Sequence, residues 1–286
     1  MLVLRWIVFV VVCAGLVHGA GKLNIIVSVP PQVYFVKKIA GDGVNVIAMV
    51  PDGRSPETYE PRPSQMGDFK DASIYFGVGM EFEKVWLERF MSINPQIDFV
   101  DLSDGLELLA YDHSHHDHSH HGRYDPHIWL SVKLSSIQAR KIYDTLKRLD
   151  PSKEAFYKKN LEQFLEEIKQ LDIAIKAIFA APNVHKVFVV YHPAFGYLAR
   201  EYGLEEIALE NEGKSPKTKE MVALRNLIAQ KHIQVIYIQP QFSKKRIASL
   251  VDDLGLKVEV LDPLKEDWRE NILHICRTIA TQGGLD

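Results

Sequence analysis

An uninterrupted amphipathic stretch in the middle of the chain restricts the fold more than any other feature. Between residues 151 and 181, apolar side chains recur at alternating spacings of four and three, the period of one helical face. These side chains are Tyr157, Leu161, Phe164, Ile168, Leu171, Ile175 and Ile178. Asp150 and Pro151 are typical of a helix start, and Pro182 of a helix end. The pattern predicts one rigid helix of about 30 residues, roughly 45 Å long at 1.5 Å per residue.

Short apolar runs separated by amphipathic stretches occur on both sides of this helix. Such alternation favours parallel sheets, because parallel strands need crossover connections that are usually helical. The runs are residues 23–29, 44–50, 72–76 and 98–100 before the helix, and 186–191, 206–208, 233–238 and 257–261 after it. The sequence therefore predicts an α/β protein of two similar lobes. Each lobe has a four-stranded parallel sheet with flanking helices, and the long helix joins them.

The first twenty residues are typical of a secretory signal peptide. Arg5 provides the basic start, residues 6–17 form an apolar stretch, and Gly19-Ala20 offers small residues where a signal peptidase could cleave. The apolar part is about twelve residues long, which is short of the roughly twenty that a membrane span needs. Lipidation at Cys13 is disfavoured because the residue before it is not small. We therefore expect export rather than membrane anchoring.

Composition restricts what the exported chain can be. Removing residues 1–20 leaves Cys276 as the single cysteine, so the core rather than a disulfide must stabilise the fold. A formal net charge of -3 without a long basic run disfavours nucleic acid and anionic membranes as partners. We expect a soluble monomer without stable membrane insertion. Its parts are a signal peptide at 1–20, an N-terminal lobe at 21–150, a linking helix at 151–181 and a C-terminal lobe at 182–286.

A histidine-rich segment at residues 113–121 indicates binding of a transition metal. Imidazole suits zinc, copper, nickel and iron better than magnesium or calcium, and the interleaved aspartates keep the segment polar. Six histidines are expected to bind metal weakly, as an auxiliary to a tighter site: His113, His115, His116, His118, His120 and His121. A solvated loop that merely tolerates histidine is the alternative.

Candidate ligands for the tighter site follow the predicted strands. Ligands of open α/β sheets bind outside the carboxyl ends of the strands. His192 and Asp262 directly follow strands, and Glu57 lies in the loop after the second strand. His127 comes just after the histidine-rich segment. Two donors from each half would hold a metal between the lobes, and two imidazoles with one or two carboxylates can fill a four-coordinate zinc sphere.

Several motifs, in this order, together resemble the periplasmic zinc and manganese receptors of ABC transporters. They are the long central helix and the segments Pro56-x-x-Tyr59-Glu60-Pro61-x-Pro63-Ser64, Asp125-Pro126-His127, Tyr191-His192-Pro193-Ala194-Phe195 and Leu261-Asp262-Pro263-Leu264. The resemblance extends from Leu23 to the C-terminus. It implies a bilobal fold, a metal at the lobe interface and delivery to an inner-membrane permease. It also implies that histidine at the third ligand position, here His192, marks a zinc receptor, where manganese receptors tend to carry glutamate.

One residue departs from the family pattern. The family's first ligand is a histidine, and Glu57 stands at that position. A carboxylate binds zinc at about 2.0 to 2.2 Å, but it makes the site harder and shifts its preference toward manganese or iron. Either Glu57 replaces the histidine, or it points away and a water or a histidine of residues 113–121 completes the sphere. Gln239, a neutral amide, is expected to hydrogen-bond a ligand or loop rather than bind metal.

The expected function is that of a receptor, not an enzyme, that captures Zn(2+) and hands it to an ABC transporter permease. A receptor for Mn(2+) or Fe(2+) with the same fold is the first alternative. A secreted zinc-dependent hydrolase is the second, although the His-Glu-x-x-His helix that often serves such enzymes does not occur in the chain. A role in cell adhesion is a further class that the sequence neither favours nor excludes.

Overall fold

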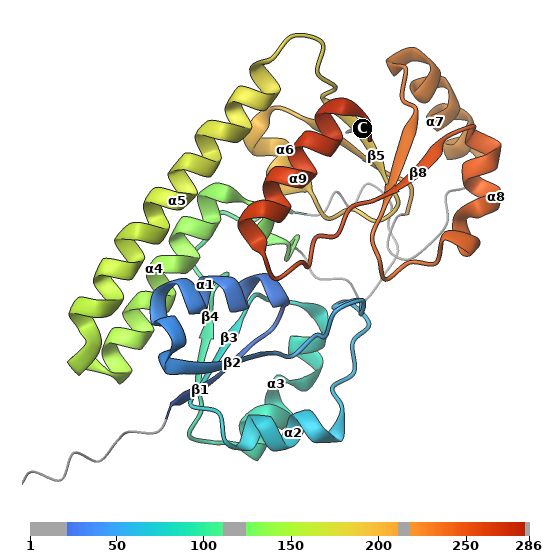
Figure 1. Ribbon diagram of the computed structural model, residues 1–286. Coiled ribbons are helices and arrows are strands. Elements are labelled where there is room, and N and C mark those ends of the chain that lie inside the picture. Colours follow the sequence, from blue (N-terminus) through green and yellow to red (C-terminus); the bar gives the residue numbers. More distant parts are fainter. Residues whose placement is uncertain (1–21, 111–123, 211–217, 284–286) are drawn as a thin grey trace, which may run out of the picture.

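Two parallel sheets form the framework of the computed structural model, which describes residues 22–110, 124–210 and 218–283 (Figure 1). Within these residues the strand orders are β2-β1-β3-β4 and β6-β5-β7-β8. The strands are β1 Leu23–Val27, β2 Val44–Ala48, β3 Ile74–Gly77 and β4 Asp98–Asp101 in the first sheet, and β5 Val187–Val190, β6 Glu205–Ala208, β7 Val235–Ile238 and β8 Lys257–Val260 in the second. Every strand predicted from the sequence is present. The predicted α/β class with two four-stranded parallel sheets is confirmed.

Helices cover both faces of each sheet. In Figure 1, α1 lies on one side of the first sheet and α2 and α3 lie on the other, while α7 and α8 cover the side of the second sheet away from α5. The helices up to the centre of the chain are α1 Pro30–Ala40, α2 Pro63–Lys70, α3 Glu81–Ile93, α4 Val132–Leu149 and α5 Glu154–Ala180. The later helices are α6 Gly196–Tyr202, α7 Thr218–Lys231, α8 Lys244–Leu254 and α9 Trp268–Thr281. Short 3-10 turns are η1 Gly41–Gly43, η2 Ile128–Leu130 and η3 Pro151–Lys153.

The long helix α5 is continuous, as predicted, but differs from the prediction at both ends. Its first turn is the 3-10 helix η3, so the α-helix spans 27 residues. At the other end Phe179 is buried in place of Ile178, which is only partly buried. An ideal α-helix drifts by about 20° per heptad against a strict seven-residue repeat. Ile178 lies three heptads after Tyr157 and has drifted away from the buried face by about 60°. The next residue, Phe179, therefore lies closer to that face.

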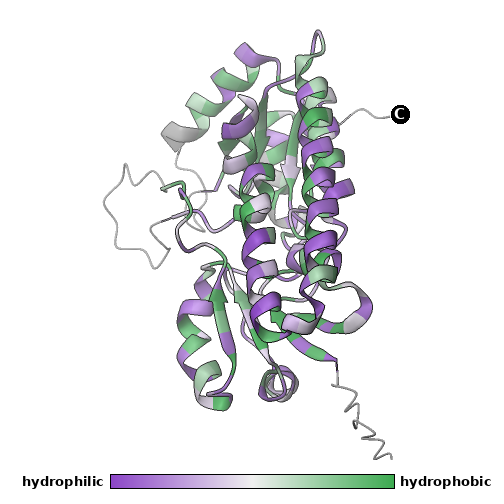
Figure 2. Ribbon diagram, turned by 90° about the vertical axis from the view of Figure 1, so that its left-hand side faces the viewer, coloured by the Kyte–Doolittle hydropathy of each residue, from purple (hydrophilic) through white to green (hydrophobic). Residues whose placement is uncertain are grey.

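The second sheet separates two hydrophobic cores. Val189 of β5 and Ile236 of β7 face a core that they share with residues of α7 and α8. Their neighbours Val190 and Tyr237 face the opposite way, into a core that includes residues of α9. This second core continues without a break into the first lobe, through α5, α4 and α1. Figure 2, viewed from the α4 and α5 side, shows hydrophilic and hydrophobic bands alternating along these two helices.

Two buried tryptophans connect the segments that precede α4 and α9. The indole N–H of Trp268 donates to the carbonyl of Trp129 at 2.6 Å, and the indole N–H of Trp129 donates to the carbonyl of Pro263 at 2.8 Å. Phe35 of α1 packs edge-on against Trp268, with ring centroids 5.0 Å apart. The lobes therefore meet through packed aromatic side chains as well as through α5. Among the described residues, no helix combines the length and the apolar character that crossing a membrane requires.

Candidate metal centre

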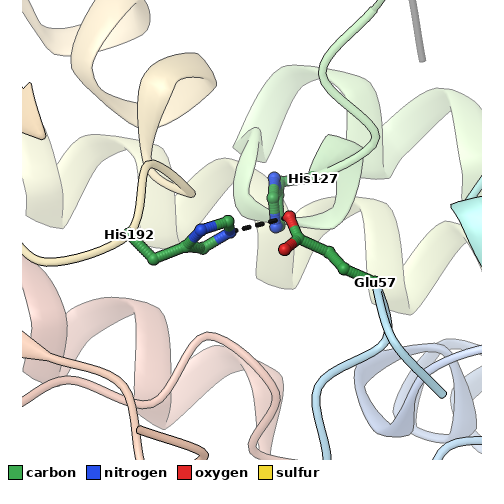
Figure 3. A group of neighbouring side chains, drawn as sticks. All are labelled: Glu57, His127 and His192. Atoms are coloured by element: carbon green, nitrogen blue, oxygen red, sulfur yellow. Dashed lines mark ion pairs between the residues drawn. The ribbon is translucent and has the colours of Figure 1, made fainter. Parts of the chain in front are cut away.

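Three of the predicted ligands converge between the lobes. Glu57, His127 and His192 each offer one donor atom, and these three atoms lie within 4.8 Å of one another (Figure 3). Glu57 comes from the loop after β2, His127 from the segment just before η2, and His192 from the loop after β5. The chain thus brings together donors from segments that are far apart in the sequence.

Asp125 holds the ring of His127 in a fixed orientation. One carboxylate oxygen of Asp125 lies 2.7 Å from Nδ1 of His127 and also accepts the backbone N–H of His127 at 2.9 Å. A carboxylate beside Nδ1 favours the tautomer with hydrogen on Nδ1, in which Nε2 is the nitrogen that can bind a cation. The phenol of Tyr197 donates to the backbone carbonyl of Asp125 at 2.7 Å. His127 is therefore prepared to bind a cation through Nε2, with a carboxylate behind it.

His192 lies between two carboxylates. Its Nε2 is 2.9 Å from Oε1 of Glu57, and its Nδ1 is 3.6 Å from Oε1 of Glu210. Burial lowers the pKa of His192, but the neighbouring carboxylates of Glu210 and Glu57 outweigh this effect and raise the pKa to about 10. The two carboxylates therefore favour the protonated form of this imidazole.

The backbone around His192 is held by side chains from neighbouring strands. Gln239, which follows β7, donates from Nε2 to the carbonyl of His192 at 2.7 Å. Glu206 of β6 accepts the backbone N–H groups of Ala194 and Phe195 at 3.1 and 3.0 Å. Burial raises the pKa of Glu206 to about 7. Gln239 therefore bonds a loop, as its amide chemistry led us to expect.

The loop that carries Glu57 is anchored by the Tyr59 side chain. Its ring packs edge-on against Phe82, with centroids 5.9 Å apart, and its hydroxyl donates to Gln65. Gln65 also donates to the carbonyl of Met49 at 2.6 Å, next to the end of β2. A surface pocket of about 370 Å³ is lined in part by Glu57, so the site lies beside an open surface.

Other predicted ligands lie outside this group of three. The Asp262 carboxylate accepts the backbone N–H of Leu264 at 2.9 Å, and burial raises its pKa. It does not belong to the three donors within 4.8 Å of one another, so its role as a ligand stays a prediction. Histidines 113, 115, 116, 118, 120 and 121 lie outside the described residues, and so does the predicted signal peptide.

Sequence reasoning missed two carboxylates beside the site, Asp125 and Glu210. A signal for each was present in the sequence. Asp125 lies two residues before His127, where an aspartate side chain readily bonds the backbone N–H two residues on. Glu210 lies two residues after β6, and β6 pairs in parallel with β5. The carboxyl ends of neighbouring parallel strands share one edge, so Glu210 belongs beside His192.

Two imidazoles and one carboxylate suit zinc as a ligand set. Zinc binds nitrogen at about 2.0 to 2.1 Å and carboxylate oxygen at about 2.0 to 2.2 Å, so tetrahedral ligand atoms lie about 3.3 Å apart. The observed distances lie on either side of this value. Glu57 and His192 are 2.9 Å apart, and all three donor atoms lie within 4.8 Å of one another. Small side-chain movements would therefore allow all three donors to share one ion.

Comparison with known proteins identifies relatives along nearly the whole chain. The chain matches the family described as zinc-uptake complex component A, periplasmic (ZnuA), over residues 25–282. It is 29% identical over 255 residues to the high-affinity zinc uptake system protein ZnuA of Bacillus subtilis, covering 85% of this chain and 79% of that protein. It is 30% identical over 276 residues to the zinc-binding lipoprotein AdcA of Streptococcus pneumoniae, covering 92% of this chain and 54% of AdcA. The chain thus spans only about half the length of AdcA.

Solved structures share the fold. A crystal structure of ZnuA superimposes with a TM-score of 0.83 at 35% identity, covering 91% of this chain and 98% of that one. The periplasmic zinc-binding protein TroA from Treponema pallidum superimposes with a TM-score of 0.79 over 91% of this chain and 99% of that one. At 22% identity, TroA supports the fold alone.

Proposed function

The chain belongs to the ZnuA family of periplasmic zinc-uptake components, and on this basis we propose that it captures Zn(2+) between its lobes and delivers it to the permease of an ABC transporter. The proposed ligands are Glu57, His127, His192 and Asp262. A water or a histidine of residues 113–121 is the alternative to Glu57. Residues 1–20 direct export and are removed, and the mature chain acts as a monomer with lobes at 21–150 and 182–286.

The observation that carries the proposal is the convergence of three donors from separate segments. Each donor atom lies within 4.8 Å of the other two, and both histidine rings are almost completely buried. Two imidazole nitrogens and a carboxylate oxygen that converge at such separations are the kind of donor set that zinc binds in proteins.

A transport role requires binding without turnover. The metal is the cargo, and no residue has to activate a water or stabilise a transition state. The relatives that match along most of this chain are named for zinc uptake and zinc binding, which supports a receptor rather than an enzyme. The permease is the partner that the family's place in an uptake complex implies.

Glu57 makes manganese or iron the competing cargo. A carboxylate in place of an imidazole favours harder cations, whereas His127 and His192 favour zinc. With two imidazole donors among the ligands, zinc is the proposed cargo. The substitution Glu57→His would restore the imidazole of the family pattern and should increase the preference for zinc over manganese.

A metal titration of the purified protein tests the proposal. We expect one tight equivalent of Zn(2+), measured by competition with a chelator, and much weaker binding of Mn(2+). His127→Ala or His192→Ala should weaken the tight equivalent by about 100-fold or more, since even partners behind the ligands are worth about 10- to 100-fold. Glu57→Ala should weaken it less, because water can take the vacated position.

The exposed His274 on α9 provides the control. His274→Ala removes an imidazole that lies outside the site, so it should leave zinc affinity unchanged. Wild-type protein without a tight equivalent, or unchanged affinity after both site histidines are replaced, would contradict the proposed function.

A further inference from the structure

The two ring nitrogens of His192 face two different carboxylates. Nε2 lies 2.9 Å from Glu57, on the side of the three converging donors. Nδ1 lies on the opposite side of the ring, 3.6 Å from Oε1 of Glu210. Nδ1 is buried and has no hydrogen-bond partner within the described residues. The Glu210 side chain is itself only 6% exposed.

A metal bound through Nε2 of His192 leaves the ring with its one N–H on Nδ1. An imidazole that binds a metal through Nε2 must be neutral, with its hydrogen on Nδ1. That N–H would be buried, and it would point toward Glu210. A buried N–H needs an acceptor, and the nearby carboxylate can supply one after a movement of less than an ångström, since such bonds are about 2.7 to 2.9 Å long.

The other histidine of the site already shows this arrangement. Nδ1 of His127 lies 2.7 Å from the carboxylate of Asp125, which leaves Nε2 directed at the group of donors. A carboxylate behind a metal-binding histidine fixes the tautomer and the ring orientation and strengthens the nitrogen as a donor. Glu210 stands in the same relation to His192.

The sheet fixes the position of Glu210. The pairing of β6 with β5 continues beyond the strands, since the backbone N–H of Leu209 donates to Val190 at 2.9 Å and that of Glu210 donates to Tyr191 at 2.8 Å. Glu210 is therefore hydrogen-bonded to the residue just before His192. The register of two parallel strands places this carboxylate beside the ring.

Building on the proposed function, we propose that Glu210 is a positioning residue of the metal site. In the zinc-bound protein its carboxylate accepts the hydrogen of Nδ1 of His192, which holds Nε2 toward the ion. Glu210 does not bind the ion itself, because it lies on the far side of the ring from Glu57.

Substitution of Glu210, combined with substitution of His192, tests this role. Glu210→Ala should weaken zinc binding about 10- to 100-fold, the usual effect of losing such a partner. Glu210→Gln should weaken it less, because the amide oxygen still accepts a hydrogen bond. In the His192→Ala background, Glu210→Ala should have no further effect, because Glu210 acts through His192. Glu205→Gln, at an exposed position of β6, should bind zinc like the wild type.

A spectroscopic measurement adds a readout that a merely structural role would not change. Nitrogen-15 spectra of zinc-loaded, histidine-labelled protein should show the His192 ring with its hydrogen on Nδ1, assigned by loss of the signal in His192→Ala. That Nδ1–H signal should shift in Glu210→Gln.

Unchanged affinity and an unchanged Nδ1–H signal in both Glu210 variants would overturn this inference and leave the proposed function intact. An equal loss from Glu210→Ala in the wild-type and His192→Ala backgrounds would also overturn it. Wild-type protein without a tight zinc equivalent would overturn both.

Discussion

Carboxylates contact both site histidines, and they determine how protons and metal compete there. Burial lowers the pKa of His192, but Glu210 and Glu57 raise it to about 10. A cation that binds Nε2 of His192 must then displace a proton at neutral pH. Under the proposed function, the Glu57 carboxylate beside Nε2 would bind the same cation.

A buried carboxylate in the first lobe, Glu83, makes stability depend on pH. Glu83 lies in the first turn of α3, is 3% exposed and accepts the backbone N–H groups of Val78 and Gly79. Burial raises its pKa from 4.5 to about 7. The folded state therefore retains a proton that the unfolded state releases between these values. The stabilisation is complete below pH 4.5 and is lost as the pH rises through about 7.

Glu83→Gln should remove this dependence, because a neutral amide does not titrate. The free energy of unfolding of the wild type should fall by roughly 2 to 3 kcal/mol more than that of the variant between pH 5 and pH 8, from a shift of about two and a half pKa units at 1.36 kcal/mol each. Urea denaturation at pH 5 and pH 8 measures this difference in the free energy of unfolding. Glu88→Gln, at an exposed position on the same helix, should behave like the wild type. If the free energy of unfolding changed equally with pH in the wild type and in Glu83→Gln, the raised pKa of Glu83 would be refuted.

At the scale of the element, α5 shows how well helical periodicity predicts which side chains are buried. The apolar positions from Tyr157 to Ile175 are all buried, as their spacing predicts. The deviation at Phe179 follows from helix geometry, since 3.6 residues per turn do not match a repeat of seven. The 3-10 first turn could not be predicted, because both kinds of helix begin with the same residue types.

Two neighbouring positions on α5 test whether packing or helix propensity stabilises it. Leu171 is fully buried, whereas Ile173 is 50% exposed. Leu171→Ala should lower the free energy of unfolding by about 2 to 5 kcal/mol, because it leaves a cavity in the core. Ile173→Ala should change it by no more than about 0.5 kcal/mol. Urea denaturation of both variants is the measurement, and equal effects would contradict the observed orientation of the helix.

At the scale of the whole molecule, the two sheets have the same strand order, and the candidate site lies between them. One hydrophobic core runs from the first lobe through α4 and α5 to α9 and one face of the second sheet. The Trp129 and Trp268 hydrogen bonds cross the same region. Because packed cores resist deformation, we expect only small lobe movements on metal binding.

The histidine-rich segment and the site between the lobes should contribute separately to metal binding. Deleting residues 113–121 should remove weak equivalents of zinc and leave one tight equivalent, because the three converging donors all lie outside the deletion. Titration calorimetry of both proteins distinguishes the two classes. Loss of the tight equivalent as well would mean that a histidine of the segment completes the primary coordination sphere.

Of the four ligand positions predicted from the sequence, Glu57, His127 and His192 lie together in the structure. Glu57 and His192 could be predicted because the carboxyl ends of parallel strands share an edge. The sequence analysis did not identify the side chains that lie behind the ligands. The positions of Asp125 and Glu210 are compatible with such a role, but only the folded chain shows that they face His127 and His192. Asp262 follows a strand as His192 does, and its carboxylate accepts the backbone N–H of Leu264, so its role as a ligand stays a prediction.

The sequence alone determined the α/β class, the number of strands in each sheet and the long helix, because these depend on local periodicity along the chain. Only the tertiary structure decided that Glu57 faces His192 and that Glu210 lies behind that ring. Such contacts depend on the relative position of loops from two lobes. A carboxylate has the same chemistry wherever it occurs in a chain, and only the folded backbone determines which nitrogen it meets.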